Sequence, residues 1–551
     1  MTREQSSRDL GGDLLNTSLS RRTLLRTAVA AGTAAQMLGA PGAVLAAQDQ
    51  TGKPGGTAVQ AVNANPLSWD VSSATWPTWE ALIHLYDRIL TFDESEQLQP
   101  GLATAWEVSE DGLTYTLHLR DGVTFHDGTP FNADAIKFNI QRNIDLPDST
   151  WYATYEPVDH VEVVDDLTAK IVLKEVRPNF AYEGFAQWGA AQVSPTAYQA
   201  QGADNYGNPP VGTGPFKFDS YEPGSEINYV RNDAYWGGAP LLDGVKIRVI
   251  PDPSVQKLEI EAKTVDSILV DPKDVGELKD KGATIDQRIS PGTSFISLNS
   301  SKPPTSELAV RKAIARAIDR DTIIKTVLFG YAEKSQAGVT SDSPFFNADV
   351  PSVEYDPDEA GKILDEAGWV MGDGDIRQKD GQPLTVNIFS TDFAGWSLYN
   401  QIIQEQLKAI GIDSKISSLE WNAYLDQWRQ NQGDWNVTYH QQGSIMAATS
   451  PIQASWVPDS YWSITQIDDA TDPDLVKVRD QLQALGDQFE VELDQEKRKE
   501  IAKQAQTIFQ DNQLAVWLWH AATIHAILPR LKDYQLTHAG RILELGKAWV
   551  E

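Results

Sequence analysis

The side chains that could perform catalysis or bind a metal are few in this sequence, and their spacing does not suit that chemistry. His520 and His525 stand five residues apart, whereas two imidazoles on one helix face need i, i+4 spacing. The absence of Cys excludes thiolate metal sites, disulfides and a Cys nucleophile. Neither a G-x-S-x-G nor an H-E-x-x-H motif occurs. We therefore expect no catalytic residues, no metal site and no cofactor.

Neighbouring carboxylates give the one enzymatic alternative. Pairs such as Asp165-Asp166 and Asp468-Asp469 could be imagined as the two acids of a glycosidase. Most such pairs stand beside turn residues in a chain with 77 acidic side chains, so many must arise by chance. Gly212-Thr213-Gly214 lacks the Lys and the following Gly of a phosphate-binding loop and is typical of a turn. A secreted glycan hydrolase is the alternative hypothesis, and a protein that is not an enzyme is favoured.

Length and charge narrow the class of protein. A chain of 551 residues with 41% hydrophobic residues can bury two or three cores, at about 100–200 residues per domain. Its 46 basic and 77 acidic residues give a net charge of −31 and a sequence pI near 4.6. Nucleic-acid binding depends on Lys and Arg that neutralise phosphates. The composition therefore predicts a folded acidic protein, expected to be a monomer, without a nucleic-acid partner.

The N-terminal residues resemble a twin-arginine export signal. Arg21 and Arg22 precede an Ala-rich, mildly apolar stretch that is too weak for a membrane-spanning helix and ends in small residues suited to cleavage. Residues 1–47 are therefore predicted to be a signal peptide read by the twin-arginine export machinery. The expected location is the periplasm, with the protein soluble or peripherally associated with the membrane.

The remaining chain is predicted to be α/β throughout. Alternating apolar residues indicate strands, and apolar residues at helical spacing indicate helices, several with N-cap residues such as Asn132 and Asp356. The pattern Asp356-Pro357-Asp358-Glu359 has the capping residue, the proline and the acid that begin a helix. The expected strands are 57–62, 115–119, 161–164, 170–173, 216–218, 245–250, 295–298, 412–419 and 514–519, and the expected helices include 76–90, 398–410, 475–489 and 498–510.

Five sequence blocks, in one order, resemble the family 5 extracellular solute-binding proteins, which are the peptide, nickel and opine receptors of ABC importers. The resemblance extends over about residues 57–530. Within the blocks, Trp106, Arg120, His126 and Trp236 are interpreted as structural residues. The blocks are Pro100–Phe131, Gly212–Phe216, Arg231–Gly238, Val310–Arg320 and Tyr355–Gly368.

The resemblance implies a periplasmic-binding-protein-like fold of two lobes joined by a two-strand hinge, with an extra β-rich subdomain in lobe I. It also implies that the lobes close over a solute and that an ABC permease receives it. Closure needs contacts that are made only in the shut state. The predicted divisions are lobe I at 50–95, 206–291 and 511–551, the inserted subdomain at 96–205, and lobe II at 292–510.

The resemblance also suggests where a solute would bind. In similar peptide receptors an aspartate after a lobe II strand pairs with the peptide's amino group; here it falls on Ile445 or Ala447, and no Asp, Glu, Lys or Arg occurs in 437–458. An unpaired buried ammonium is costly, so a neutral polar solute, with an oligosaccharide favoured, is preferred to an oligopeptide or dipeptide with a free N-terminus. The predicted ligand-binding residues are aromatic or carry amides: Trp69, Trp76, Trp151, Tyr152, Trp188, Phe393, Trp396, Tyr439, Gln441 and Gln442.

Overall fold

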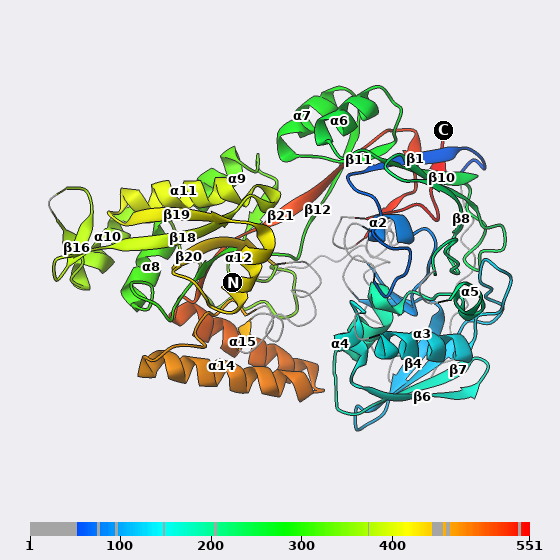
Figure 1. The fold of residues 1–551 in the computed structure, drawn as a ribbon, viewed down its shortest axis with the longest axis horizontal. Helices are drawn as coiled ribbons and strands as arrows, with labels where there is room; N and C mark the ends of the chain where they lie inside the picture. The colour runs from blue at the N-terminus through cyan, green and yellow to red at the C-terminus, as the bar shows by residue number, and fades with distance from the viewer. Residues whose placement is uncertain are drawn as a thin grey trace, which may run out of the picture. The chain divides into compact units, whose positions relative to one another are not determined.

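The computed structural model describes residues 52–73, 78–93, 97–146, 149–202, 206–372, 374–442, 456–458, 463–537 and 542–551 (Figure 1). All the elements described belong to the unit formed by residues 51–551. The predicted signal peptide with Arg21 and Arg22, and also Trp76, Ile445 and Ala447, lie outside the described residues. Among the helices that the structure describes, none is long and apolar enough to cross a membrane.

The largest sheet contains twelve described strands in the order β19-β18-β20-β13-β21-β11-β1-β10-β9-β8, with β12 and β14 also paired to β21. The predicted strand at 57–62 is confirmed as β1. The bounds are β1 Thr57–Val62, β8 Phe216–Glu222, β9 Glu226–Arg231, β10 Gly244–Val249, β11 Ser267–Leu269, β12 Thr284–Ile289, β13 Ser294–Leu298, β14 Ala332–Lys334, β18 Thr385–Thr391, β19 Asp413–Leu419, β20 Val437–Gln441 and β21 Ala515–Ile527.

Strand β21 is longer than the strand predicted at 514–519 and joins two parts of this sheet. Its first residues pair antiparallel with β13, and its last residues pair with β11 and β12. The strand continues past Trp519 to Ile527, with Ile524, Ala526 and Ile527 buried. The prediction stopped too early because pairing partners on both sides, more than two hundred residues away, sustain the strand.

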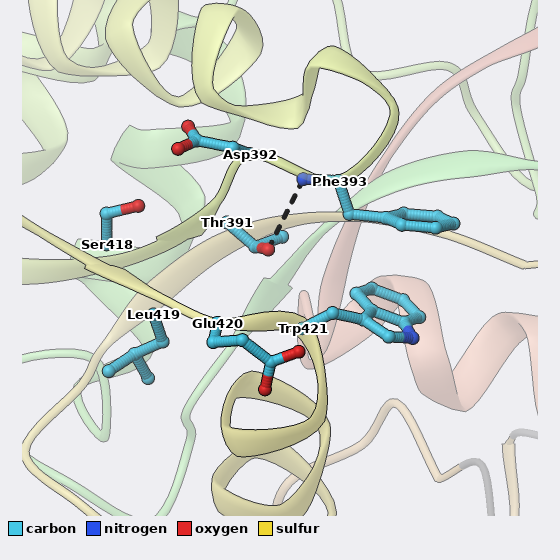
Figure 2. Close-up of a pocket in the computed structure, with 7 residues that line it drawn as sticks. All are labelled: Thr391, Asp392, Phe393, Ser418, Leu419, Glu420 and Trp421. Carbon is cyan, nitrogen blue, oxygen red and sulfur yellow. Dashed lines mark hydrogen bonds between the residues drawn. The ribbon is translucent and has the colours of Figure 1, made fainter.

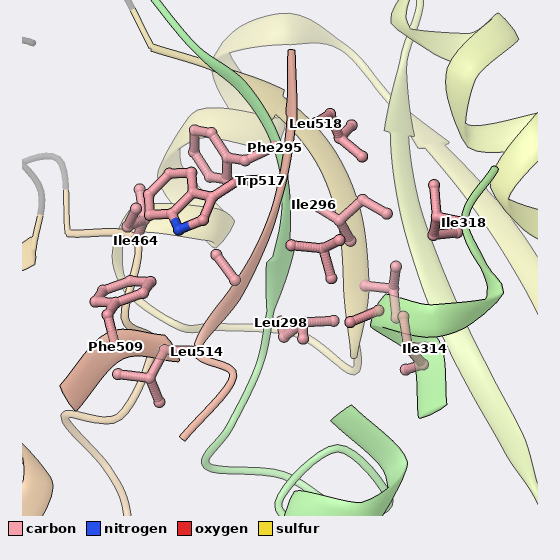
Figure 3. Packing of buried hydrophobic residues seen from close by; sticks show 14 of the residues in the cluster. Phe295, Ile296, Leu298, Ile314, Ile318, Ile464, Phe509, Leu514, Trp517 and Leu518 are labelled. Carbon is pink, nitrogen blue, oxygen red and sulfur yellow. The ribbon is translucent and has the colours of Figure 1, made fainter. Parts of the chain in front are cut away.

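The core around β13, β20 and the start of β21 is the larger of the hydrophobic clusters. Side chains alternate across the sheet: Phe295, Trp517 and Phe509 gather on one side of β13 and β21, whereas Ile296, Leu518 and Ile314 lie on the other (Figure 3). The helices of this part are α8 Leu308–Ala317, α9 Arg320–Thr326, α10 Pro357–Glu366, α11 Trp396–Ala409, α12 Trp421–Arg429, α14 Pro473–Val491 and α15 Gln495–Asp511, with η5 Phe393–Gly395 and the short strands β15 Val370–Met371, β16 Arg377–Lys379 and β17 Gln382–Pro383.

A separate four-stranded antiparallel sheet, ordered β4-β5-β7-β6, has its own core, and helix α3 packs on it (Figure 1). The strands predicted at 115–119, 161–164 and 170–173 are confirmed within it. Asn132 caps α3, as predicted, by accepting the Ala135 N–H. The bounds are β4 Ala103–Val108, β5 Thr114–Leu119, β6 Val158–Asp165, β7 Thr168–Leu173, α3 Ala133–Asp145, α4 Tyr152–Tyr155, η1 Ala181–Ala186, η2 Trp188–Ala190 and α5 Pro195–Gln201.

The helix predicted at 76–90 is wrong for most of its length. Within the described residues, α2 covers only Trp79–Leu82. The carbonyl oxygens of His84 and Leu85 instead accept the N–H groups of Phe216 and Gly214, at 3.0 and 2.9 Å. Because these carbonyl groups bond to a distant segment, the helix does not continue through them. The other elements are β2 Leu90–Phe92, β3 Leu98–Pro100, α6 Pro253–Glu261, η4 Pro272–Asp274, α7 Val275–Asp280, β22 Leu531–Lys532, β23 Gln535–Leu536, β24 Leu543–Glu544 and β25 Trp549–Val550.

Residues from two of the sequence blocks that suggested the family donate hydrogen bonds to the carboxylate of Asp87. It accepts hydrogen bonds from Thr213 Oγ1 at 2.9 Å, Tyr235 Oη at 2.9 Å and Trp236 Nε1 at 2.8 Å. His126 contacts the Gly214 carbonyl through Nε2 at 3.0 Å. A Cβ on Gly212 would lie 2.2 Å from the Leu85 carbonyl oxygen, so this turn accepts only glycine there. The structural interpretation of His126 and Trp236 is confirmed.

The helix start predicted at Asp356 is confirmed and gives a test of local stability. Asp356 Oδ1 accepts the Glu359 N–H at 2.8 Å, and Pro357 begins α10. We expect Asp356→Ala to lower the free energy of unfolding by about 1 kcal/mol, because an orphan N–H loses its acceptor. The exposed neighbour Asp358 supplies the control, because Asp358→Ala should change the free energy of unfolding by less than about 0.5 kcal/mol. Urea unfolding followed by circular dichroism measures both; equal losses would show that the cap is not the cause.

Candidate functional site

The candidate site is a pocket of about 460 Å³ where two parallel strands end side by side. Strands β18 and β19 pair in register from Thr385 with Asp413 to Thr391 with Leu419, so their carboxyl ends meet at one edge. Ligands of open α/β sheets bind in crevices at the carboxyl ends of strands. The pocket residues are the last residues of the two strands and the first residues after them: Thr391, Asp392, Phe393, Ser418, Leu419, Glu420 and Trp421 (Figure 2).

Two aromatic rings form one wall of this pocket. The rings of Phe393 and Trp421 are stacked, with centroids 4.0 Å apart and planes inclined by 21° (Figure 2). Phe393 is 46% exposed, and the ring of the buried Trp396 meets both at their edges, at 5.8 and 5.4 Å. An exposed, supported aromatic surface can take the flat apolar face of a solute.

Two carboxylates stand beside the rings. Glu420 is the N-cap of α12, where its side chain accepts the Asn422 N–H at 3.0 Å. Asp392 follows β18 directly and is exposed. The Phe393 N–H donates to Thr391 Oγ1 at 3.4 Å, which fixes the start of this loop. Carboxylate oxygens are acceptors, so the pocket can bind the hydroxyl groups of a sugar or the ammonium of an amine.

The rings rest on an uncharged aromatic layer. Trp421 stacks on the buried Tyr424 at 5.9 Å, and Trp396 lies 4.9 Å from His440. Burial lowers the pKa of His440 to about 3, so its imidazole is neutral at physiological pH. The side chains beneath the pocket are therefore neutral and closely packed. This surrounding favours a solute that binds by stacking and hydrogen bonds rather than one that needs a buried charge.

Three of the predicted residues from the first part of the chain, Trp69, Trp151 and Trp188, lie in or against a hydrophobic core. Trp188 is buried and stacks on Trp79 at 5.3 Å, with the Arg88 guanidinium 4.5 Å from its ring centre. Trp151 is half-buried, and its Nε1 donates to the Val71 carbonyl at 3.2 Å. Tyr152 is half-buried at the start of α4, and Trp69 packs edge-on against Phe218 and Tyr221.

Of the predicted residues from the second part of the chain, only Phe393 lines the pocket, and Trp396 packs against the two rings. Tyr439 is buried, stacks on Tyr399 at 4.4 Å and donates to Ser294 Oγ at 2.9 Å. Gln441 is exposed at the end of β20, and Gln442 is buried with its backbone N–H bonded to Thr293. The Gln442 Nε2 has no hydrogen-bond partner in the described ranges.

Sequence reasoning missed Asp392, Glu420 and Trp421. A signal was available, because each stands within two residues of the end of a strand, and parallel strands present such side chains at a common edge. What the sequence does not reveal is that β18 and β19 are neighbours in the sheet. Across the described residues, no group of three or more His, Cys, Asp or Glu side chains could hold a metal ion.

Comparisons with known proteins agree with this architecture. Residues 97–463, about two thirds of the chain, match the family described as bacterial extracellular solute-binding proteins, family 5 Middle. The dipeptide-binding protein of Escherichia coli K12 is 27% identical over 83% of this chain and 88% of its own length. The nickel-binding periplasmic protein of the same bacterium is 28% identical over 69% of this chain and 73% of its own.

Solved structures show the same fold. NikA from Brucella suis, in complex with Fe(III)-EDTA, superposes with a TM-score of 0.80 and 25% identity over 90% of this chain and all of that one. The fold is therefore the mixed α/β, two-lobed type of periplasmic binding proteins. These relatives are binding proteins rather than enzymes. The chain belongs to family 5 of the bacterial extracellular solute-binding proteins.

Proposed function

We propose that this protein is the extracytoplasmic receptor of an ABC importer, which closes around a polar solute and delivers it to the permease. The observation that carries the proposal is the stacked pair Phe393 and Trp421 beside two carboxylates, at the carboxyl ends of β18 and β19. Family membership supplies the class of transporter. The solute leaves unchanged, and the protein is not an enzyme.

An oligosaccharide is the first candidate solute. The apolar face of a sugar ring stacks on an aromatic side chain, and its hydroxyl groups donate to carboxylates such as Asp392 and Glu420. An extended sugar chain would also use amide groups such as that of Gln441, which is exposed nearby at the end of β20. The absence of charged residues in 437–458 supports an uncharged ligand.

A peptide is the second candidate, and the two carboxylates of the pocket support it. Asp392 and Glu420 are acids that the sequence argument against a free N-terminus did not consider, and either could pair with an ammonium group. The relatives include a dipeptide-binding protein. A secreted glycan hydrolase, the alternative of another class, predicts that an oligosaccharide is cleaved; recovery of the intact sugar after incubation, by mass spectrometry, would exclude it.

Export and the division into lobes complete the proposal. Residues 1–47 with Arg21 and Arg22 act as a twin-arginine signal peptide, and the exported protein is a soluble or peripherally associated periplasmic monomer. Lobe I comprises 50–95, 206–291 and 511–551 with the subdomain 96–205, and lobe II comprises 292–510. The antiparallel pairing of β21 with β11, β12 and β13 supports a hinge near residues 290–293 and 519–522. Of the remaining predicted contacts, Gln441, Trp69, Trp151 and Tyr152 keep partial exposure in the structure.

A thermal-shift screen tests the solute class. Oligosaccharides, peptides and metal chelates are each added, and a ligand at 100 times its Kd should stabilise the protein by about 2.7 kcal/mol. We expect Trp421→Ala and Phe393→Ala to weaken that ligand's binding by about 30-fold or more, since each removes half of the aromatic wall. Phe329→Ala, which truncates a Phe of similar exposure (52%) outside the pocket, is the control. Unchanged affinity in both pocket variants would place the binding site elsewhere.

A further inference from the structure

Charged side chains connect two parts of the fold that have separate hydrophobic cores. One part is the four-stranded sheet β4-β5-β7-β6 with the segment η1, and the other contains the helix pair α14 and α15. Arg177 Nη1 lies 3.3 Å from Glu490 Oε1, although the two residues are 313 positions apart in sequence. Glu183 on η1 and Arg498 on α15 stand beside this pair. We call Arg177, Glu183, Glu490 and Arg498 the clasp.

Arg498 is the buried member of the clasp. Its side chain is 1% exposed, and its guanidinium carbon lies 3.9 Å from the centre of the Phe489 ring. Its Nη1 donates to the Phe489 carbonyl at 2.7 Å, while Nε and Nη2 have no hydrogen-bond partner in the part of the chain that is described. A buried guanidinium is stable when an anion compensates its charge. The structure therefore places an incompletely bonded cation at this contact.

Glu183 supplies a carboxyl group from the other side. It interacts electrostatically with Arg177, Arg498 and Glu490, and burial raises the pKa of its carboxyl group to about 7 against the opposing effect of the two arginines. Tyr115 also contacts the clasp, because its hydroxyl donates to the Arg177 carbonyl at 2.9 Å. Charges from both parts of the fold thus converge on a half-buried contact, where attraction is screened less than at an open surface.

Apolar packing accompanies these charges. Leu493, in the turn between α14 and α15, lies so close to Gly112 that a Cβ there would be 3.0 Å from Leu493 Cδ2. The same Cβ would be 3.3 Å from Val176 Cγ1, next to Arg177. The two parts therefore meet through close side-chain packing as well as through charges.

We propose that the clasp is a latch: it holds the β4-β5-β7-β6 sheet against helices α14 and α15, and its strength sets how readily these two parts separate. A contact made in one arrangement and lost in another shifts the equilibrium between them by its own free energy. The proposal goes beyond solute binding, because the clasp shares no residue with the pocket. It applies to the protein without any ligand.

The test measures the separation of the two parts directly. Because the chain has no Cys, a pair of spin labels can be attached specifically at Glu162→Cys on β6 and Gln481→Cys on α14, both exposed. Electron–electron double resonance on the full chain then gives the distribution of distances. We expect Arg177→Gln and Glu490→Gln each to increase the population at longer distance about two- to fivefold relative to the labelled parent. The double variant should show less than the product of the two single effects, since the residues act as a pair.

Asp474→Asn is the matched control, because this exposed acid lies on the same helix and pairs with Lys477 in its own helix. It should leave the distribution unchanged. Circular dichroism confirms that each variant keeps its secondary structure. Distributions identical to that of Asp474→Asn, or single effects that multiply without coupling, would overturn the latch. Neither result bears on the solute-binding proposal, which the thermal-shift screen tests separately.

Discussion

Asp87→Ala is expected to lower the free energy of unfolding by about 3–5 kcal/mol, the largest loss that we predict for a single substitution outside the hydrophobic core. Three donors, on Thr213, Tyr235 and Trp236, would lose their shared acceptor. A polar group left without a partner inside a protein costs about 1–3 kcal/mol. Thr213 is 1% exposed, so in the folded protein its hydroxyl depends on this buried acceptor.

The pattern of variants distinguishes this explanation from a general effect of removing an acid. Asp87→Asn keeps one acceptor oxygen and should lose less than Asp87→Ala. Asp121→Ala removes an exposed carboxylate and should change stability by less than about 0.5 kcal/mol. The stability of the three variants is compared through the midpoints of denaturant unfolding, provided that the dependence of the unfolding free energy on denaturant concentration is unchanged. If Asp87→Ala unfolded at the same midpoint as Asp121→Ala, the proposed role of the Asp87 carboxylate would be wrong.

The same hydrogen bonds explain which elements could be predicted from sequence. The helix starts at Asn132 and Asp356 were correct because a cap depends on residues within one turn. The helix at 76–90 was wrong because its carbonyls bond to Gly214 and Phe216, more than a hundred residues later. The full length of β21 was missed for the same reason. A helix cap can be predicted from a single sequence because its residues are neighbours. Hydrogen bonds between distant segments cannot be predicted in this way.

The residues of the candidate site show the same difference between local and long-range determinants. Phe393 was predicted to bind ligand, and the pocket contains it, but Trp421 was not predicted although its ring stacks on Phe393. Trp188 and Trp396 show the converse, since both are aromatic residues in segments expected to face a ligand and both are buried. The exposure of a tryptophan depends on which distant elements cover it. Composition can therefore suggest an aromatic binding surface without identifying its members.

Acidification is expected to destabilise the protein through its buried neutral histidines, of which His84 and His440 have the most strongly lowered pKa values. Burial lowers the pKa of both His84 and His440 from the ordinary 6.5 to about 3. Below pH 6.5 the unfolded chain binds protons that the folded protein does not, so stability falls as pH falls from 6.5 towards 3 and is unaffected by these groups above that window. Each histidine contributes a slope of about 1.4 kcal/mol per pH unit. Glu183, whose pKa burial raises to about 7, acts in the opposite direction between pH 7 and 4.5.

His440→Phe isolates one of these contributions without removing the ring. His440 stacks on Phe295 at 5.3 Å and lies 4.2 Å from the Trp428 ring, and Phe keeps both ring contacts. The substitution removes the contact of Nδ1 with the Gln441 carbonyl at 3.1 Å, whereas Nε2 has no hydrogen-bond partner among the residues described. Urea unfolding between pH 6.5 and 4 should give a slope smaller than that of the parent by about 1.4 kcal/mol per pH unit. His160→Asn, which replaces an exposed histidine, should leave the slope unchanged. Because Glu183 is present in all three proteins, its opposing contribution cancels in the comparison, and equal slopes for the parent and His440→Phe would mean that His440 is protonated in the folded state.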